Sequence, residues 1–176
     1  KYGVGLDNID FSFCEDIKLP VYFKPGVNSA EVAEQAIAMM IGLGRNLFTS
    51  TRNMTNGNWQ KDGGTNFTGK TISVIGCGHV GSKVARLSKA FSCDVLVVDT
   101  LDKSDFCTEI GATQVELGRA LRESDYMSLH VPLTDETKSM INESTLSQSK
   151  RGMVLVNTSR GEVVDLSSAI KFLEQG

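Results

Sequence analysis

A strand-like run that leads directly into three spaced glycines constrains this chain more than any other feature. The run 71–75 is rich in β-branched residues and precedes Gly76, Gly78 and Gly81, which have the spacing Gly-x-Gly-x-x-Gly; a helical pattern follows. In such a unit the first glycine allows a tight turn, the second lets the backbone approach a pyrophosphate, and the third lets helix and strand pack closely. The helix also directs unpaired amides and its positive dipole end at the phosphates. The spacing therefore predicts a dinucleotide site.

A carboxylate at the end of the next apolar run indicates which dinucleotide is bound. Asp99 lies 18 residues after Gly81, close to the roughly 20 typical of the acid that binds the adenosine ribose. Its charge should repel a 2′-phosphate, so we expect NAD rather than NADP. Thr100 follows, not an arginine, although Lys103 is near enough to leave NADP open. The alternative is a glycine-rich turn in an ordinary α/β protein, with Asp99 only capping a strand.

Composition and charge argue against several other classes of protein. The 176 residues are 40% apolar, enough for one core, and a net charge of −3 does not suit a nucleic-acid-binding surface. No apolar stretch reaches membrane-spanning length, and no secretory signal opens the chain. The four cysteines show neither a Cys-x-x-Cys pair nor metal-ligand spacing. We therefore expect a cytoplasmic protein with free thiols, without a metal site, and without a nucleic-acid or membrane partner.

A long helical pattern begins after the turn at Pro25 and Gly26. Asn28 and Glu31 have the spacing of a capping box. The apolar residues in 32–47 cover more than one face of this helix, whereas a surface helix needs only one stripe. Either a second subunit or domain covers the excess, or the helix is buried all round within its own domain. The pattern alone leaves both alternatives open.

Short apolar runs alternate with helical patterns along the rest of the chain. This alternation predicts an α/β fold, a doubly wound parallel sheet of the Rossmann type. Ligands of such sheets bind beyond the carboxyl ends of the strands. Gly76, Asp99, His130 and the run 158–160 all follow predicted strands, so we expect them around one crevice. The other expected elements are helices at 10–17, 117–122 and 143–146, strands at 20–23, 126–130 and 153–157, a connector at 52–70, and a last helix capped by Asp165.

Five blocks of sequence, in order, resemble the NAD-binding domain of the D-isomer-specific 2-hydroxyacid dehydrogenases. They are 3–10, 25–28 with 32–34, 76–81, 128–134, and 157–161 with 164–165. The glycine loop and the stretch 111–115 look most like phosphoglycerate dehydrogenases. The resemblance covers residues 1–176 as a near-complete NAD-binding domain, whose flanking substrate-binding halves we expect outside the chain. It implies hydride transfer between NAD(H) and a D-2-hydroxy acid or 2-oxo acid, and a homodimer formed through the long helix after Asn28.

The resemblance also implies roles for individual residues. Arg160 matches the catalytic arginine that binds the substrate carboxylate, a task suited to a planar, permanently charged fork. From the residues alone, Arg160 could instead cap a helix or pair with Glu162. The acid/base histidine and its glutamate are expected beyond Gly176, so His130 is expected beside the cofactor or in a structural role. The expected cofactor-binding residues are Val4, Gly76, Gly78, His79, Val80, Gly81, Asp99, His130, Val131, Pro132, Thr158, Ser159 and Arg160.

Two other functions fit the same blocks. The family that the chain resembles includes NAD-sensing corepressors, which use this domain to dimerise, so an interaction protein is one alternative. Formate- or phosphite-type dehydrogenases, which share the fold and the arginine, are the other. The block at 25–28 favours a metabolic enzyme over a corepressor.

Overall fold

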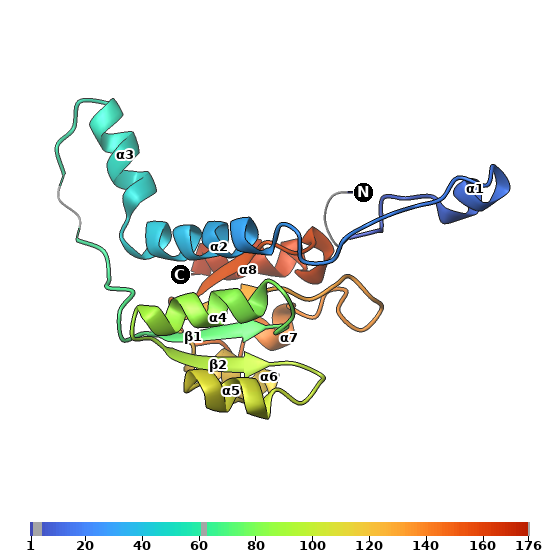
Figure 1. Ribbon diagram of the computed structural model, residues 1–176. Helices are drawn as coiled ribbons and strands as arrows, with labels where there is room; N and C mark the ends of the chain where they lie inside the picture. Colours follow the sequence, from blue (N-terminus) through green and yellow to red (C-terminus); the bar gives the residue numbers. More distant parts are fainter. Residues whose placement is uncertain (2–4, 61–62, 176) are drawn as a thin grey trace.

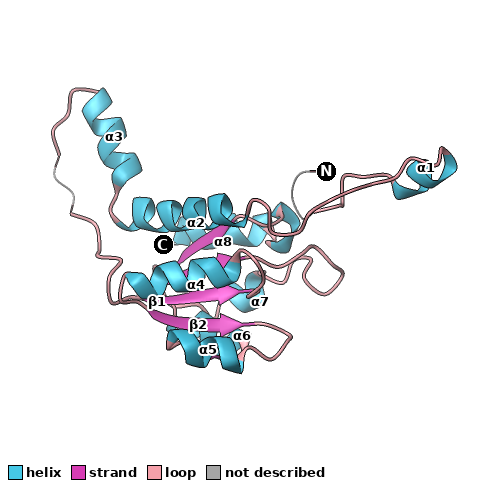
Figure 2. Ribbon diagram, viewed as in Figure 1, coloured by secondary structure: helices cyan, strands magenta, loops and turns pink. Residues whose placement is uncertain are grey.

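A parallel sheet lies at the centre of the computed structural model, which describes residues 1, 5–60 and 63–175. In this part of the chain the strands are β1 (Thr71–Ile75), β2 (Asp94–Val98), β3 (Thr113–Gln114), β4 (Tyr126–Leu129) and β5 (Val154–Asn157). Their order is β3-β2-β1-β4-β5, and every neighbouring pair is parallel. The arrowheads of β1 and β2 therefore point to the same edge (Figure 2). This confirms the predicted Rossmann-type sheet.

Helices cover both faces of the sheet because successive residues of each strand point to opposite sides. On one face Ile72 and Val74 pack with buried residues of α2 (Ser29–Gly44), α4 (Gly81–Ala90) and α5 (Ser104–Ile110). On the other face Ile75 packs with α6 (Leu117–Glu123), α7 (Glu143–Leu146) and α8 (Leu166–Gln175). The result is a three-layer domain with the sheet in the middle (Figure 1).

The connections make β1 the point at which the winding reverses. From β1 the chain builds β2 and then β3 on one side, and it returns past β1 to build β4 and β5 on the other. At such a point the loops leaving neighbouring strands diverge, and a crevice opens at their carboxyl ends. The loops after β1, β2, β4 and β5 carry the residues that the sequence singles out, so the fold brings them to one edge.

Most of the apolar face of the long helix at residues 29–44 is buried against its own domain. Ala33, Ala36, Ile37 and Met40 are buried, and they belong to the core that includes α4 and β5. Much of the apolar excess seen in the sequence is therefore used within the chain. Exposed apolar side chains gather instead around α1 (Phe11–Asp16) and on α3 (Leu47–Thr55). Both segments project from the rest of the domain (Figure 1). None of the described helices is long and apolar enough to cross a membrane.

Several local expectations are wrong. Residues 20–23 form no strand, because the segment projects away from the sheet and finds no partner there (Figure 1). Asn28 stands at the N-cap of α2, but its side chain makes no capping bond; the Ser29 hydroxyl donates to the Gly26 carbonyl instead, at 2.7 Å. The helical run does not continue to residue 47, since Asn46 adopts a left-handed conformation and a separate α3 follows.

The structure also differs from the expectations at one boundary, the start of the connector, and in two short elements that were not predicted, α5 and β3. The connector predicted at 52–70 starts late, because α3 extends to Thr55. Between β2 and α6 the chain forms α5, closed by the left-handed Gly111, and then the two-residue strand β3. The last helix begins as predicted, with the Asp165 carboxylate accepting from the Ser168 amide at 3.2 Å.

Candidate functional site

The loop 76–81, called the cofactor loop below, owes its shape to three different steric demands. Gly76 has φ +88°, and a Cβ there would lie 2.8 Å from the carbonyl oxygen of His130. A Cβ on Gly81 would lie 2.0 Å from the carbonyl oxygen of Gly76, so α4 packs directly on the end of β1. No described atom lies within 4 Å of a Cβ built on Gly78, apart from its chain neighbours. The middle glycine thus borders open space beside bare backbone.

The N-terminal end of α4 lies beside that open space. Val80 occupies the N-cap position and offers no side-chain oxygen, so the first turn of the helix has no side-chain cap. Within that turn the Ser82 amide donates to the Gly78 carbonyl at 3.0 Å and the Lys83 amide donates to the Val80 carbonyl at 2.9 Å, so attraction of an anion to this end rests on the helix dipole rather than on these two amides. The exposed Gly78 and His79 lie at this end of α4. The loop fits a pyrophosphate, since a side chain at residue 78 would fill the same space.

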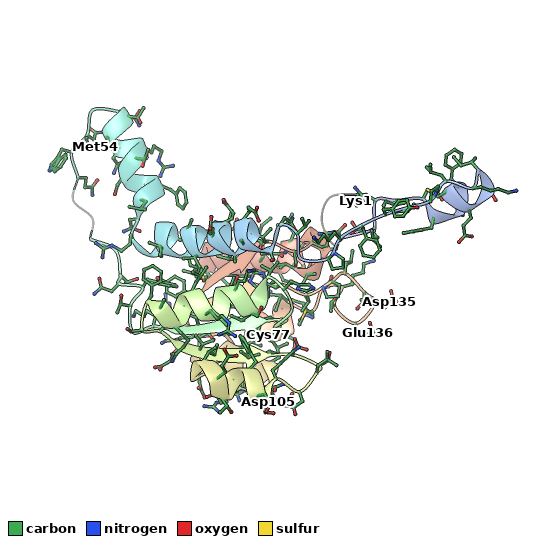
Figure 3. The ribbon with its side chains drawn as sticks, viewed as in Figure 1. Lys1, Met54, Cys77, Asp105, Asp135 and Glu136 are labelled. Atoms are coloured by element: carbon green, nitrogen blue, oxygen red, sulfur yellow. The ribbon has the colours of Figure 1, made fainter. Side chains whose placement is uncertain are left out.

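Asp99 ties the cofactor loop to the end of β2. Its Oδ2 accepts from the Cys77 amide at 2.7 Å, and its Oδ1 accepts from the Leu101 amide at 2.9 Å. Each carboxylate oxygen has a second lone pair, so Asp99 can also accept from ribose hydroxyls. The Cys77 side chain, labelled in Figure 3, is buried, and desolvation raises the pKa of its thiol to about 11. The thiol therefore stays neutral and contributes no charge.

A polar cavity of about 440 Å³ opens beside Asp99, between the ends of β2 and β3. The Gln114 side chain holds the loop that leads into it: its Oε1 accepts from the Lys103 amide at 2.7 Å, and its Nε2 donates to the Leu101 carbonyl at 2.9 Å. Sequence reasoning missed Gln114, because a lone glutamine on a two-residue strand gives no pattern. The cavity is lined by Val98, Asp99, Asp102, Gln114, Val115 and Glu116. Three carboxylates in this lining disfavour a 2′-phosphate, in agreement with NAD.

His130 directly follows β4, and its side chain lies between the ends of β4 and β5. Its Nε2 lies 2.8 Å from the Ser128 hydroxyl, and its Nδ1 lies 3.3 Å from the Thr158 hydroxyl. Burial lowers the pKa of the imidazole to about 4. The ring is therefore neutral at pH 7 and links two strand ends, which suits a structural residue beside the cofactor better than a charged proton donor.

The arginine corner, as we call Gly5, Asp7, Asn157, Ser159 and Arg160, lies where β5 ends. Arg160 pairs with Asp7, and not with Glu162 as one alternative expected: Nε lies 3.0 Å from both Asp7 carboxylate oxygens, and Nη2 lies 2.6 Å from Oδ1. This bond holds the pKa of the Asp7 carboxyl below its ordinary value. Asp7 was missed in the sequence because 153 residues separate it from Arg160.

The remaining residues expected to bind the cofactor are His79, Val131, Pro132, Thr158 and Val4. A Cβ on Gly26 (φ +74°) would lie 2.8 Å from the ring of His79, so the turn before α2 rests on the cofactor loop. Val131 packs close to Gly76. The Thr158 hydroxyl lies within hydrogen-bond distance of the His130 ring. The Pro132 carbonyl accepts from the Thr137 hydroxyl at 2.6 Å. Val4 lies outside the described residues.

Comparisons with known proteins agree with this arrangement. Residues 37–176 match the family described as D-isomer specific 2-hydroxyacid dehydrogenase, NAD binding domain. The chain is 38% identical over 182 residues to a glyoxylate reductase of Korarchaeum cryptofilum, covering 100% of this chain and 55% of that protein. The chain thus spans about half the length of the curated relatives it matches.

Solved structures give the same result. The apo-structure of D-lactate dehydrogenase from Escherichia coli is similar to this chain with a TM-score of 0.90 and 35% identity, over 99% of this chain and 57% of that one. The D-lactate dehydrogenase from Aquifex aeolicus complexed with NAD and lactic acid has a TM-score of 0.87 and 35% identity, over 98% and 52%. With the sequence match over 37–176 and the sheet order described above, this chain belongs to the D-isomer-specific 2-hydroxyacid dehydrogenase family, as its NAD-binding domain.

Proposed function

We propose that the protein containing this domain transfers a hydride between NAD(H) and a D-2-hydroxy acid or its 2-oxo acid. The observation that carries the proposal is the pairing of an open glycine cradle with a guanidinium at the same edge of the sheet. Gly78 leaves room for a pyrophosphate beside the first turn of α4, and Arg160 stands at the end of β5. When bound, NAD supplies the hydride acceptor; the chain supplies the binding and orientation.

The proposed cofactor contacts follow the course of the crevice. The backbone of Gly76 to Gly81, including His79 and Val80, holds the pyrophosphate. Asp99 accepts from the adenosine ribose, and its neighbours along the acidic cavity keep out a 2′-phosphate. Val131, Thr158 and Ser159 are the residues proposed to contact the nicotinamide half. The other residues proposed to lie beside the cofactor are Val4, His130, Pro132 and Arg160.

For catalysis we assign one residue of this chain. Arg160 grips the substrate carboxylate and polarises the adjacent carbonyl, which a charged, planar fork does well. A histidine and a glutamate outside these residues would move the proton, a contribution worth about 10²–10⁴ in rate. The 176-residue chain should therefore show little or no turnover by itself. Several relatives carry the names of enzymes acting on glyoxylate, hydroxypyruvate, D-lactate and D-3-phosphoglycerate, and a substrate of this class is what Arg160 suits.

We also propose a cytoplasmic homodimer formed through α2. Much of α2 is covered by its own domain, but exposed apolar side chains flank it at both ends: Val27 before the helix, and Leu43, Leu47 and Phe48 near its end. Two copies that paired these regions would cover them. Sedimentation of a folded chain as a monomer at micromolar concentration would argue against this assembly.

The cofactor proposal is tested by titrating the chain with NADH and NADPH. We expect NADH to bind more tightly, and Asp99→Ala to weaken NADH binding about tenfold or more, because charged hydrogen bonds to the ribose are lost. Asp94→Ala is the matched control, since Asp94 begins the same strand at its far end and is exposed. Absence of NADH binding to a folded chain, or equal loss in both variants, would contradict the proposal.

A further inference from the structure

The guanidinium of Arg160 is held along one edge by a carboxylate from the start of the chain. Nε and Nη2 donate to Asp7, and Nη1 donates to the Ser159 carbonyl at 2.9 Å. A guanidinium carries five N–H groups in a fixed plane. These bonds use three of them, and among the described residues they leave one N–H on Nη1 and one on Nη2. The end of the fork that points away from Asp7 is thus available for a second carboxylate.

The backbone beneath the pair is shaped to receive it. A Cβ on Gly5 would lie 1.4 Å from Nη2 of Arg160 and 2.8 Å from Oδ1 of Asp7. The ion pair therefore lies directly against the bare backbone of Gly5. Any side chain at this position would push the guanidinium out of its plane or break its bond to Asp7.

The main chain of Arg160 is fixed independently by Asn157. Its Nδ2 donates to the Arg160 carbonyl at 2.7 Å, and its Oδ1 accepts from the Ser159 amide at 2.9 Å. Asn157 thereby holds the backbone of the turn that carries Arg160, while Asp7 holds the guanidinium at the end of the side chain. The long side chain of Arg160, which has many rotamers in solution, is in this way restricted to one orientation.

A carboxylate next to this arginine could act in three ways: it could orient the guanidinium, block it, or only tether the start of the chain. The geometry favours orientation, because Asp7 takes the edge formed by Nε and Nη2 and leaves the Nη1–Nη2 end, which can also bind a carboxylate through two parallel bonds. We propose that Asp7 is a positioning residue, which turns the free end of the Arg160 fork toward the substrate carboxylate. This role rests on the substrate-binding function proposed above for Arg160.

The first part of the test needs no cofactor. The Nε–H signal of Arg160, assigned by its loss in Arg160→Lys, is followed by NMR in the 176-residue chain. In the wild type we expect slow exchange with water, and in Asp7→Asn exchange about tenfold faster, because a charged acceptor is lost. Asp10→Asn is the matched control: Asp10 accepts from the Ser12 hydroxyl and the Phe13 amide rather than from Arg160. Unchanged exchange in Asp7→Asn would overturn the proposal.

The second part measures carboxylate binding directly. The chain saturated with NADH is titrated with oxamate, an isostere of a 2-oxo acid, and we expect Asp7→Asn to bind it about tenfold more weakly than the wild type and Asp10→Asn. Tighter oxamate binding in Asp7→Asn would show that Asp7 blocks the arginine, and equal binding would show that it only tethers the chain; both overturn the proposal. NADH affinity, read in the same samples, should be equal in all three. Absence of NADH binding would count against the proposed function, whereas the cofactor-free exchange rates would still test whether Asp7 holds the Arg160 guanidinium.

Discussion

The cofactor loop and the arginine corner lie at the same edge of the sheet, but backbone geometry shapes the first and side-chain hydrogen bonds shape the second. The cofactor loop is formed by backbone: Gly76, Gly78 and Gly81 are required by a positive φ, an open space and a close approach. The arginine corner is formed by side chains, with Asp7 and Asn157 holding Arg160 through hydrogen bonds. Backbone geometry is dictated by neighbours in sequence, whereas side-chain pairing can join distant segments. The first region should therefore fail through steric clash, and the second through loss of orientation.

The largest effect should come from adding one carbon to the close approach in the cofactor loop. In Gly81→Ala the new Cβ meets the Gly76 carbonyl, which belongs to the backbone and cannot swing aside. We expect the free energy of unfolding to fall by about 4 kcal/mol, measured by urea denaturation followed by circular dichroism.

Gly78→Ala is the matched comparison for that loss. Its Cβ enters open space, so we expect stability within about 1 kcal/mol of the wild type. NADH affinity should nevertheless fall about 100-fold, because the methyl group occupies the place of the pyrophosphate. If both alanine variants unfolded alike, or if Gly78→Ala bound NADH normally, the steric account of the loop would be wrong.

The buried His130, which contacts side chains at the ends of β4 and β5, should make folding sensitive to acid. The pKa of His130 is lowered to about 4 in the folded chain, against about 6.5 when unfolded, so between these values the unfolded state binds more protons. Stability should therefore be full above pH 6.5 and fall as the pH drops toward 4, by up to about 3 kcal/mol. His130→Gln should flatten this part of the pH profile relative to the wild type.

His79→Gln is the control for that profile. His79 is exposed, so its replacement should leave the slope between pH 4 and 6.5 in place. A wild-type profile without that slope would mean that the buried imidazole does not govern acid unfolding.

The smallest effect should come from the Gln114 side chain. Gln114→Ala removes the bonds to the Lys103 amide and the Leu101 carbonyl, which hold the loop beside the acidic cavity. Each such bond is worth about 1 kcal/mol, so we expect NADH to bind about fivefold more weakly by fluorescence titration. Gln148→Ala, at a glutamine just after α7 whose side chain donates to the Ser144 carbonyl at 3.1 Å, should leave NADH affinity unchanged. Equal weakening in both variants would contradict a local role for Gln114.

The sequence predicted the sheet and the cofactor loop well because their rules are local. The β-branched run 71–75 and the spacing of three glycines depend on residues a few positions apart. The strand expected at 20–23 failed for the opposite reason: its apolar pattern was suitable, but a strand needs a partner, and the segment projects away from the sheet. The break of the long helix at Asn46 depends on a single left-handed residue, which hydrophobic periodicity cannot reveal.

The candidate site divides along the same line. Asp99 was predicted as a ribose-binding acid from its distance to Gly81, but its bond to the Cys77 amide was not, because that spacing carries no information about a backbone partner. Arg160 was recognised through the resemblance of its block, whereas its partner Asp7 lies 153 residues away. Only the folded chain brings those two segments together.

The bond between Asp99 and the Cys77 amide has a kinetic consequence. Both partners of this contact belong to the chain itself, so we expect the cofactor loop to keep its shape with or without a dinucleotide. Rigid, preorganised sites lose less conformational entropy on association than sites that must first take shape. NADH capture at this loop should accordingly proceed in one kinetic phase, with an observed rate that rises linearly with NADH concentration.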